Sequence, residues 1–152
     1  MVPHDNIINR RIFEIRPLVT PRQLAAKLPL TDAGKSVVVG GRDAVSGILE
    51  GKDDRLFVVV GPCSVHDPVA ALEYARLLAS LAHEVEEDLL VVMRVYFEKP
   101  RTTVGWKGLI SDPGLDDSFE VNDGLFLARD LLLEVLGLGL PVGCEFLDPI
   151  TP

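Results

Sequence analysis

The stretch LFVVVGPCSVHDP, residues 56–68, contains the signals that decide the fold. Its first five residues are apolar and mostly β-branched, which is typical of a strand buried on both faces of a parallel sheet. Gly61 and Pro62 end that strand. Asp67 before Pro68 is a favourable helix start, because an N-cap residue precedes proline at the first helical position. The stretch therefore predicts one unit of strand, turn and helix.

Toward the C-terminus the chain continues to alternate predicted helices and strands. In order, these are a helix over 69–83, a strand over 89–93, a polar loop over 98–122, a helix with Asn122 or Asp123 as its N-cap, and a strand over 142–147. The order β-α-β-loop-α-β predicts parallel strands joined by right-handed crossovers. Since a closed βα barrel needs about 250 residues, we expect the front half of a larger architecture.

The residues before the first strand form a separate, helical lead. Two helices are expected there, one over 22–28 after the N-cap Thr20, and one over 31–49 that ends at Gly51. Gly40 and Gly41 count against the second helix, because each costs roughly 1 kcal/mol relative to alanine in a helix interior. We therefore expect residues 1–51 to be an N-terminal extension and residues 52–152 to carry the sheet.

The composition is that of one acidic globular domain. The chain has 152 residues, with 15 Lys plus Arg against 23 Asp plus Glu, a net charge of -8. That balance argues against a nucleic-acid partner, which a basic face would bind, but leaves a small anionic substrate open. No apolar run reaches the roughly 18 residues of a membrane span, and the first twenty residues hold no signal-peptide core. Two cysteines are too few for a disulfide scaffold. We expect a cytoplasmic protein without a membrane partner.

The predicted strand ends carry polar side chains, and the first of these ends holds Cys63 and His66. In βα proteins functional groups gather at the carboxyl ends of the strands. A thiolate and an imidazole could together ligate a divalent transition metal. A metal site needs three or four ligands, however, and no second such pair is present. A buried cysteine beside a capping histidine therefore stays open as the alternative.

The second strand end is rich in positive charge. Four cations fall within fourteen residues, opposed locally only by Glu98; they are Arg94, Lys99, Arg101 and Lys107. Guanidinium and ammonium groups suit carboxylates and phosphates, and Thr102 adds a hydroxyl donor. Gly105 and Gly108 around Trp106 indicate a shaped loop. The segment is therefore a candidate anion site, with an ordinary solvated loop as the alternative.

Glu145 lies in the third predicted strand, near its end. A buried carboxylate is costly unless it is paired or coordinated. Glu145 could contact a cation, hold a water molecule or take part in proton transfer. A structural partnership with an arginine of the sheet is an equally good interpretation. His4 and His83 resemble ordinary surface residues.

Three longer motifs in this chain closely resemble those of a known enzyme family. They are GPCSVHDP at 61–68, VMRVYFEKPRTTVGWKG at 92–108, and GCEFLD at 143–148 followed by ITP at 150–152. In order and spacing they are similar to the class I 3-deoxy-D-arabino-heptulosonate 7-phosphate (DAHP) synthases, which open the shikimate pathway. The KPRT sequence of residues 99–102 separates this family from a relative that uses arabinose 5-phosphate. The resemblance is strong from about residue 52 onward and weaker before it.

The resemblance implies a fold and a reaction. The implied fold is α/β, the N-terminal half of a (β/α)8 TIM barrel with a short helical N-terminal extension, so that residues 52–152 would form the first three βα units. The implied reaction joins phosphoenolpyruvate to erythrose 4-phosphate and releases phosphate. The family commonly assembles as homo-oligomers, dimers or tetramers, and is commonly inhibited by an aromatic amino acid. These are the partners that we expect.

Individual residues take roles from the same resemblance. Arg94 and Lys99 match the groups that hold phosphoenolpyruvate, chiefly its carboxylate. Arg101 and Thr102 match the binders of the phosphate group of erythrose 4-phosphate. Glu145 matches the glutamate beside phosphoenolpyruvate, and both Lys99 and Glu145 are implied to be catalytic.

The resemblance also implies a divalent metal ion of the Mn, Fe, Co or Zn type, with Cys63 as one ligand. His66 belongs to the same motif but is not usually counted as a ligand. The family's other ligands, a histidine, a glutamate and an aspartate, lie in the second half of the barrel. An isolated chain of 152 residues is therefore expected to be inactive. The alternative to a synthase is a non-catalytic remnant or interaction module of the same family.

Overall fold

The computed structural model describes residue 12, residues 14–99 and residues 104–147. Seven helices and strands lie in these residues, in the order α1 (Pro21–Lys27), α2 (Asp32–Leu49), β1 (Leu56–Val60), α3 (Pro68–Glu84), β2 (Leu89–Arg94), α4 (Val121–Gly137) and β3 (Val142–Gly143). Within the described part of the chain, none of the helices has the length and apolarity that crossing a bilayer would require.

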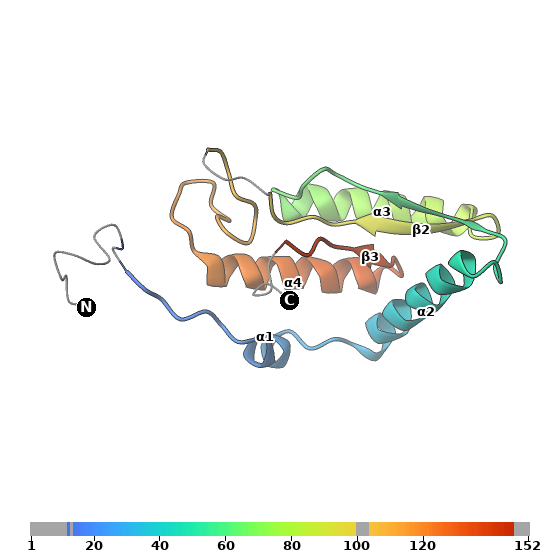
Figure 1. The fold of residues 1–152 in the computed structure, drawn as a ribbon, viewed down its shortest axis with the longest axis horizontal. Helices are drawn as coiled ribbons and strands as arrows, with labels where there is room; N and C mark the ends of the chain where they lie inside the picture. The colour runs from blue at the N-terminus through green and yellow to red at the C-terminus, as the bar shows by residue number, and fades with distance from the viewer. Residues whose placement is uncertain (1–11, 13, 100–103, 148–152) are drawn as a thin grey trace.

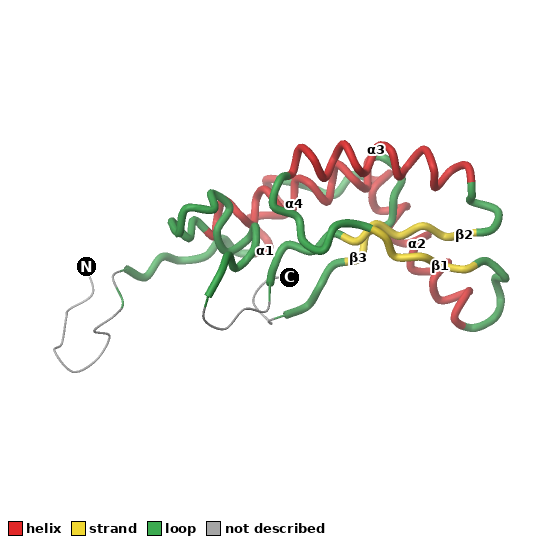
Figure 2. Tube along the Cα trace, turned by 90° about the horizontal axis from the view of Figure 1, so that it is seen from above, coloured by secondary structure: helices red, strands yellow, loops and turns green. Residues whose placement is uncertain are grey.

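The three strands form one parallel sheet in chain order, β1-β2-β3. Leu56 pairs with Leu89 and Val60 with Met93, while Arg94 of β2 pairs with Gly143 of β3. Helices α3 and α4, which connect the strands, lie on the same side of the sheet (Figure 2). Consecutive parallel strands with their crossover helices on one side are the arrangement of a TIM barrel. The predicted fold class is confirmed.

The main core lies between the sheet and these two helices. Val91, Met93 and Val95 alternate along β2 and its continuation, point toward the helices and are buried. Ala75 and Leu78 of α3 belong to the same core cluster, which also includes five buried residues of the other crossover helix and its exit: Leu125, Ala128, Leu131, Val135 and Leu140. Burial of such side chains contributes roughly 1.5–3 kcal/mol each for the larger ones, so this layer holds the strand ends in place.

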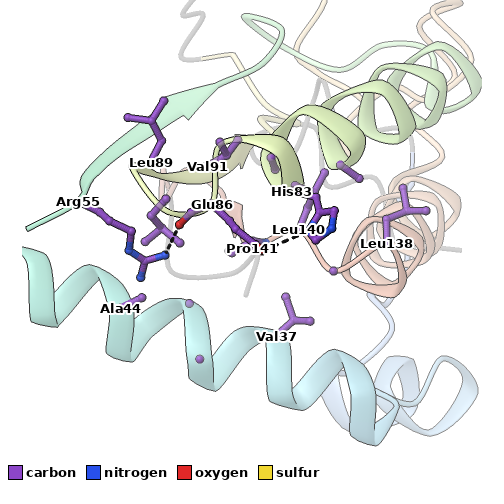
Figure 3. Close-up of a pocket in the computed structure, with 16 residues that line it drawn as sticks. Val37, Ala44, Arg55, His83, Glu86, Leu89, Val91, Leu138, Leu140 and Pro141 are labelled. Carbon is purple, nitrogen blue, oxygen red and sulfur yellow. Dashed lines mark hydrogen bonds and ion pairs between the residues drawn. The ribbon is translucent and has the colours of Figure 1, made fainter. Parts of the chain in front are cut away.

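Helix α2 lies at the amino ends of the strands (Figures 1 and 3). It is continuous through Gly40 and Gly41, although two adjacent glycines weaken a helix. At Gly41 the reason is a close approach, since a Cβ there would lie 2.9 Å from the Cβ of Pro141. Gly51 has a φ of +68° just beyond the helix, the left-handed conformation that commonly ends helices.

A cavity of about 540 Å³ separates α2 from the end of α3 and the turn before β3 (Figure 3). The polar groups of this cavity already have partners. Arg55 donates from Nη1 to the carbonyl of Glu86 at 3.1 Å, and its guanidinium pairs with Asp53 at 2.7 Å. His83 Nδ1 lies 3.2 Å from the Glu86 carboxylate. Because it lies at the amino ends of the strands, we assign this cavity no chemistry.

The segment before α2 packs along α4 (Figure 1). Arg16 pairs with Glu120 at 2.7 Å, and Arg129 Nε donates to the carbonyl of Leu28 at 2.7 Å. Thr20 caps α1 as predicted, with its hydroxyl accepting from the amide of Gln23 at 3.3 Å. The N-terminal segment is therefore held against α4 by these contacts.

Two boundaries differ from the sequence predictions. Helix α4 begins at Val121, and its N-cap position is Glu120, without a side-chain cap. The predicted cap, Asn122, is engaged elsewhere: its Oδ1 accepts from the amide of Val19 at 2.8 Å, and its Nδ2 donates to a carbonyl of the N-terminal segment. Strand β3 spans two residues rather than the predicted 142–147, and the chain beyond it leaves the sheet.

Candidate active site

The loops that follow β1 and β2 meet at the carboxyl edge of the sheet. The amide of Val65 donates to the carbonyl of Tyr96 at 2.7 Å. Arg94 Nη2 donates to the carbonyl of Cys63 at 3.1 Å. Gly61 permits this close approach, since a Cβ there would lie 2.3 Å from the carbonyl oxygen of Arg94. The first two strand ends are thereby fixed to each other.

The thiol of Cys63 lies beside two cations. Lys99 Nζ is 3.1 Å from Cys63 Sγ, and Arg94 Nη2 is 3.9 Å from it. The hydrogen bond and charge of Lys99 lower the pKa of this thiol, and Arg94 adds to the effect. The side chain is exposed. An exposed thiol that favours the thiolate has the chemistry of a soft metal ligand.

Arg94 is held by an aromatic face as well as by the neighbouring loop. Its Cζ lies 4.2 Å from the centroid of the Tyr96 ring, a favourable cation–π geometry. Tyr96 stands two residues further along the extended chain, so both side chains leave from the same side. Among the described residues, Nε of Arg94 is buried and has no hydrogen-bond partner.

Glu145 joins the chain after β3 to the loop after β2. Its Oε1 accepts from the amides of Phe97 and Glu98, at 2.7 and 2.5 Å. Within the described residues, Oε2 is buried and has no partner. The structure therefore shows a backbone-binding role for one oxygen, and the sequence interpretation of a partnership with an arginine is not what these contacts show. Glu145 also helps to line a small cavity of about 170 Å³.

Residues 97–99 and 107–109 form a short antiparallel hairpin inside the segment that the sequence predicted as a loop. Glu98 bridges to Gly108, and the amide of Lys99 donates to the carbonyl of Lys107 at 2.9 Å. Gly108 has a φ of +123°, and a Cβ there would lie 2.1 Å from the carbonyl oxygen of Phe97. Gly105 and Gly108, noted in the sequence as marks of a shaped loop, were the signal for it.

The described part of the structure brings only some of the predicted site residues together. Cys63, Arg94 and Lys99 are in contact, with Glu145 on the neighbouring strand end. Arg101 and Thr102 lie outside the described residues. The ring of His66 meets the edge of Trp106, with centroids 6.5 Å apart. Sequence reasoning missed Tyr96, although an aromatic residue two positions after an arginine in a strand was a usable signal.

The described residues do not form a complete metal centre. Within residue 12 and the ranges 14–99 and 104–147, no three His, Cys, Asp or Glu side chains are grouped so that they could hold an ion. Cys63 fits as one soft ligand, given its thiolate-favouring surroundings. A bound ion would need two or three further ligands.

A parallel βα sheet with two cations, an exposed thiol and a carboxylate at its carboxyl edge defines a class: a βα protein with a candidate site for a small anion at the strand ends. Comparison with known proteins specifies the family. The model of the DAHP synthetase I family matches residues 27–152, and the chain belongs to this family.

Individual relatives agree with that assignment. The chain is 59% identical over 148 residues to a phospho-2-dehydro-3-deoxyheptonate aldolase of Amycolatopsis methanolica, covering 97% of this chain and 73% of the relative. It is 58% identical over 142 residues to the Phe-sensitive enzyme of that name from Escherichia coli K12, covering 93% and 41%. The solved structure of the Francisella tularensis aldolase superposes with a TM-score of 0.89 at 49% identity, covering 93% and 41%. The chain thus spans about two fifths of the last two proteins.

Proposed function

We propose that the protein containing this chain is a DAHP synthase, which condenses phosphoenolpyruvate with erythrose 4-phosphate to form 3-deoxy-D-arabino-heptulosonate 7-phosphate and phosphate. The observation that carries the proposal is the convergence of Arg94 and Lys99 at one strand edge of a DAHP synthetase I family member. Two adjacent cations in an acidic chain of net charge -8 are a focused site for an anion. The names of its relatives support the same reaction.

In this proposal Arg94 and Lys99 bind phosphoenolpyruvate, chiefly through its carboxylate. The exposed Nη2 end of the Arg94 guanidinium and the Nζ of Lys99 supply charge-assisted donors. Arg101 and Thr102 bind the phosphate group of erythrose 4-phosphate. Holding both anions in place converts a two-body encounter into an oriented reaction.

The proposed bond changes follow from that placement. C3 of phosphoenolpyruvate forms a bond to the aldehyde carbon of erythrose 4-phosphate, water adds at C2, and the resulting intermediate releases phosphate. Lys99 and Glu145 are the proposed catalytic residues. Glu145 has one oxygen fixed by two backbone amides, so its other oxygen is held in a constant direction for a proton or a polarised group.

A divalent metal ion is part of the proposal, with Cys63 as one of its ligands. When bound, such an ion acts as a Lewis acid toward the aldehyde. Its other ligands are proposed to come from residues beyond those described. An ion of the Mn, Fe, Co or Zn type suits a site that includes a thiolate.

Organisation and regulation are proposed on the same basis. Residues 1–51 would be an N-terminal extension, and residues 52–152 the first three βα units of the barrel. The E. coli relative is named Phe-sensitive, which supports an aromatic amino acid as effector. We propose a homo-oligomer, dimer or tetramer, as the assembled form.

The test is a synthase assay on the protein at its natural length. Purified protein with added divalent metal should consume phosphoenolpyruvate only when erythrose 4-phosphate is present. Replacing erythrose 4-phosphate by arabinose 5-phosphate, and adding a chelator, are the controls that should abolish turnover. A folded, metal-supplied protein without any turnover would contradict the proposal and favour a non-catalytic member of the family.

A further inference from the structure

Trp106 lies on the returning side of the short hairpin that carries Lys99. The amide of Leu109 donates to the carbonyl of Phe97 at 2.6 Å, and that of Lys99 to the carbonyl of Lys107 at 2.9 Å. These bonds fix the backbone of Lys99, while its Nζ lies 3.1 Å from Cys63 Sγ. A two-stranded hairpin of this length is marginal by itself in water. Something outside the hairpin must therefore hold it.

The indole of Trp106 makes two contacts that join the hairpin to other segments. Its Nε1 donates to the carbonyl of Asp112 at 2.7 Å. Its ring meets the ring of His66 edge-on, at 88° with centroids 6.5 Å apart, an arrangement favourable for aromatic pairs. The ring is half-buried and packs against the main core. Three segments meet at this side chain: the hairpin, the loop behind it, and the loop after β1.

The carbonyl that receives the indole is itself fixed. Asp112 is only 3% exposed. Its amide donates to the carbonyl of Gly108 at 2.9 Å, and its Oδ2 accepts from the amide of Asp117 at 3.3 Å. Gly108 has no side chain, and the two sides of the hairpin are too close to admit one there. The backbone bridge between Glu98 and Gly108 must therefore be supported by neighbouring side chains. Trp106 is one of them, through its hydrogen bond to the carbonyl of Asp112.

We infer that Trp106 is a positioning residue that, together with His66, holds the Lys99 hairpin against the loop carrying Cys63. The inference rests on the proposed function, because Lys99 matters to the reaction only if it binds the anionic substrate. It also gives a role to His66, which the sequence pairs with Cys63 but whose ring the structure places against Trp106. Loss of the indole N–H should leave the fold intact and loosen Lys99.

The test compares Trp106→Phe, which keeps a ring but removes the N–H donor, with His66→Ala, which removes the edge contact. Tyr74→Phe on the exposed face of α3 is the control. In the protein at its natural length, the amides of Lys99 and Leu109 should exchange with solvent about fivefold to tenfold faster in Trp106→Phe, as expected for one lost hydrogen bond. The dissociation constant for phosphoenolpyruvate should rise by a similar factor, and the urea midpoint of unfolding should fall only slightly, because one hydrogen bond is lost while a ring is kept against the core.

Each result decides the inference. Exchange rates in Trp106→Phe equal to those of the control would overturn it. So would a lower urea midpoint combined with unchanged phosphoenolpyruvate affinity, because that marks a merely structural role. If the unsubstituted protein does not bind phosphoenolpyruvate, the proposed function fails, and amide exchange alone still decides whether Trp106 holds the hairpin. If Trp106→Phe does not fold, His66→Ala should show exchange about twofold to threefold faster, and equality with the control would count against the inference.

Discussion

Replacing Glu145 by alanine should destabilise the protein strongly, because one carboxylate oxygen serves two amides. Oε1 accepts from Phe97 and Glu98 at 2.7 and 2.5 Å. A hydrogen bond to a charged group contributes about 1.5–3 kcal/mol, and a buried donor left without a partner adds a further cost. The two bonds together give a loss of about 3 kcal/mol or more for Glu145→Ala. Glu145→Gln keeps an oxygen acceptor without the charge, so about half of this loss is expected.

Urea unfolding of the protein at its natural length measures both values, provided that the slope of the transition is unchanged. Glu84→Ala, at an exposed position near the end of α3, is the matched control and should change the free energy of unfolding by less than about 0.5 kcal/mol. The expected order of stability is control, then Gln, then Ala. An alanine variant as stable as the Glu84 control would refute the reasoning, because the two amides would then have adequate partners without the carboxylate.

Three further predictions test the site. Cys63→Ser should lower bound metal and turnover together, since a soft ligand is lost; unchanged metal content by elemental analysis would remove Cys63 from the ligand set. In metal-free protein near neutral pH, iodoacetamide should label Cys63 before Cys144, as read by peptide mapping. Lys99 lowers the pKa of Cys63, so its thiolate persists to lower pH. Desolvation of the thiol and the charge of Glu145 raise the pKa of Cys144 to about 11, although the residue as a whole is exposed. Labelling in the opposite order would contradict this assignment. Arg94→Ala should weaken the binding of phosphoenolpyruvate by about 1.5–3 kcal/mol, and Arg101→Ala should weaken the binding of erythrose 4-phosphate by a similar amount. If both variants weakened the binding of the same substrate equally, the division of roles between the two arginines would be wrong.

The first two βα units could be predicted from sequence because their signals are local. The apolar run of β1 and the Asp67-Pro68 start of α3 act within a few residues, and the structure shows a strand and a helix there. The expected burial of the strand on both faces is wrong in the described residues, since Leu56 and Val59 are exposed. Asp67 Oδ1 accepts from the amides of Val69 and Ala70 at 2.9 and 3.2 Å. Such capping depends on neighbours in the chain alone.

The boundaries that failed depend on residues far apart in the sequence. Asn122 has the side chain of a helix cap, but it binds the backbone of residues 17 and 19 instead. Strand β3 is short: Val95 donates to the carbonyl of Gly143, but the next amide in line, that of Phe97, donates to the carboxylate of Glu145 instead of a backbone carbonyl. No local pattern indicates that a side chain will replace a strand partner.

In the candidate site, too, the local features could be predicted from sequence and the long-range contacts could not. The sequence indicated that Arg94 and Lys99 belong to one anion site, because both follow one buried strand. It could not indicate that the Lys99 ammonium would lie 3.1 Å from Cys63 Sγ, since that distance depends on a hairpin closed by Gly108 and on the pairing of two strands.

We propose that Arg94 and Lys99 at the carboxyl edge of the sheet bind the carboxylate of phosphoenolpyruvate. Calorimetric titration of phosphoenolpyruvate into the protein at its natural length, beside Lys99→Met, tests it most directly. We expect saturable binding to the unsubstituted protein and at least about tenfold weaker binding to Lys99→Met, which corresponds to a loss of about 1.4 kcal/mol. Equal affinities for the two proteins, or no binding to a folded unsubstituted protein, would contradict the claim.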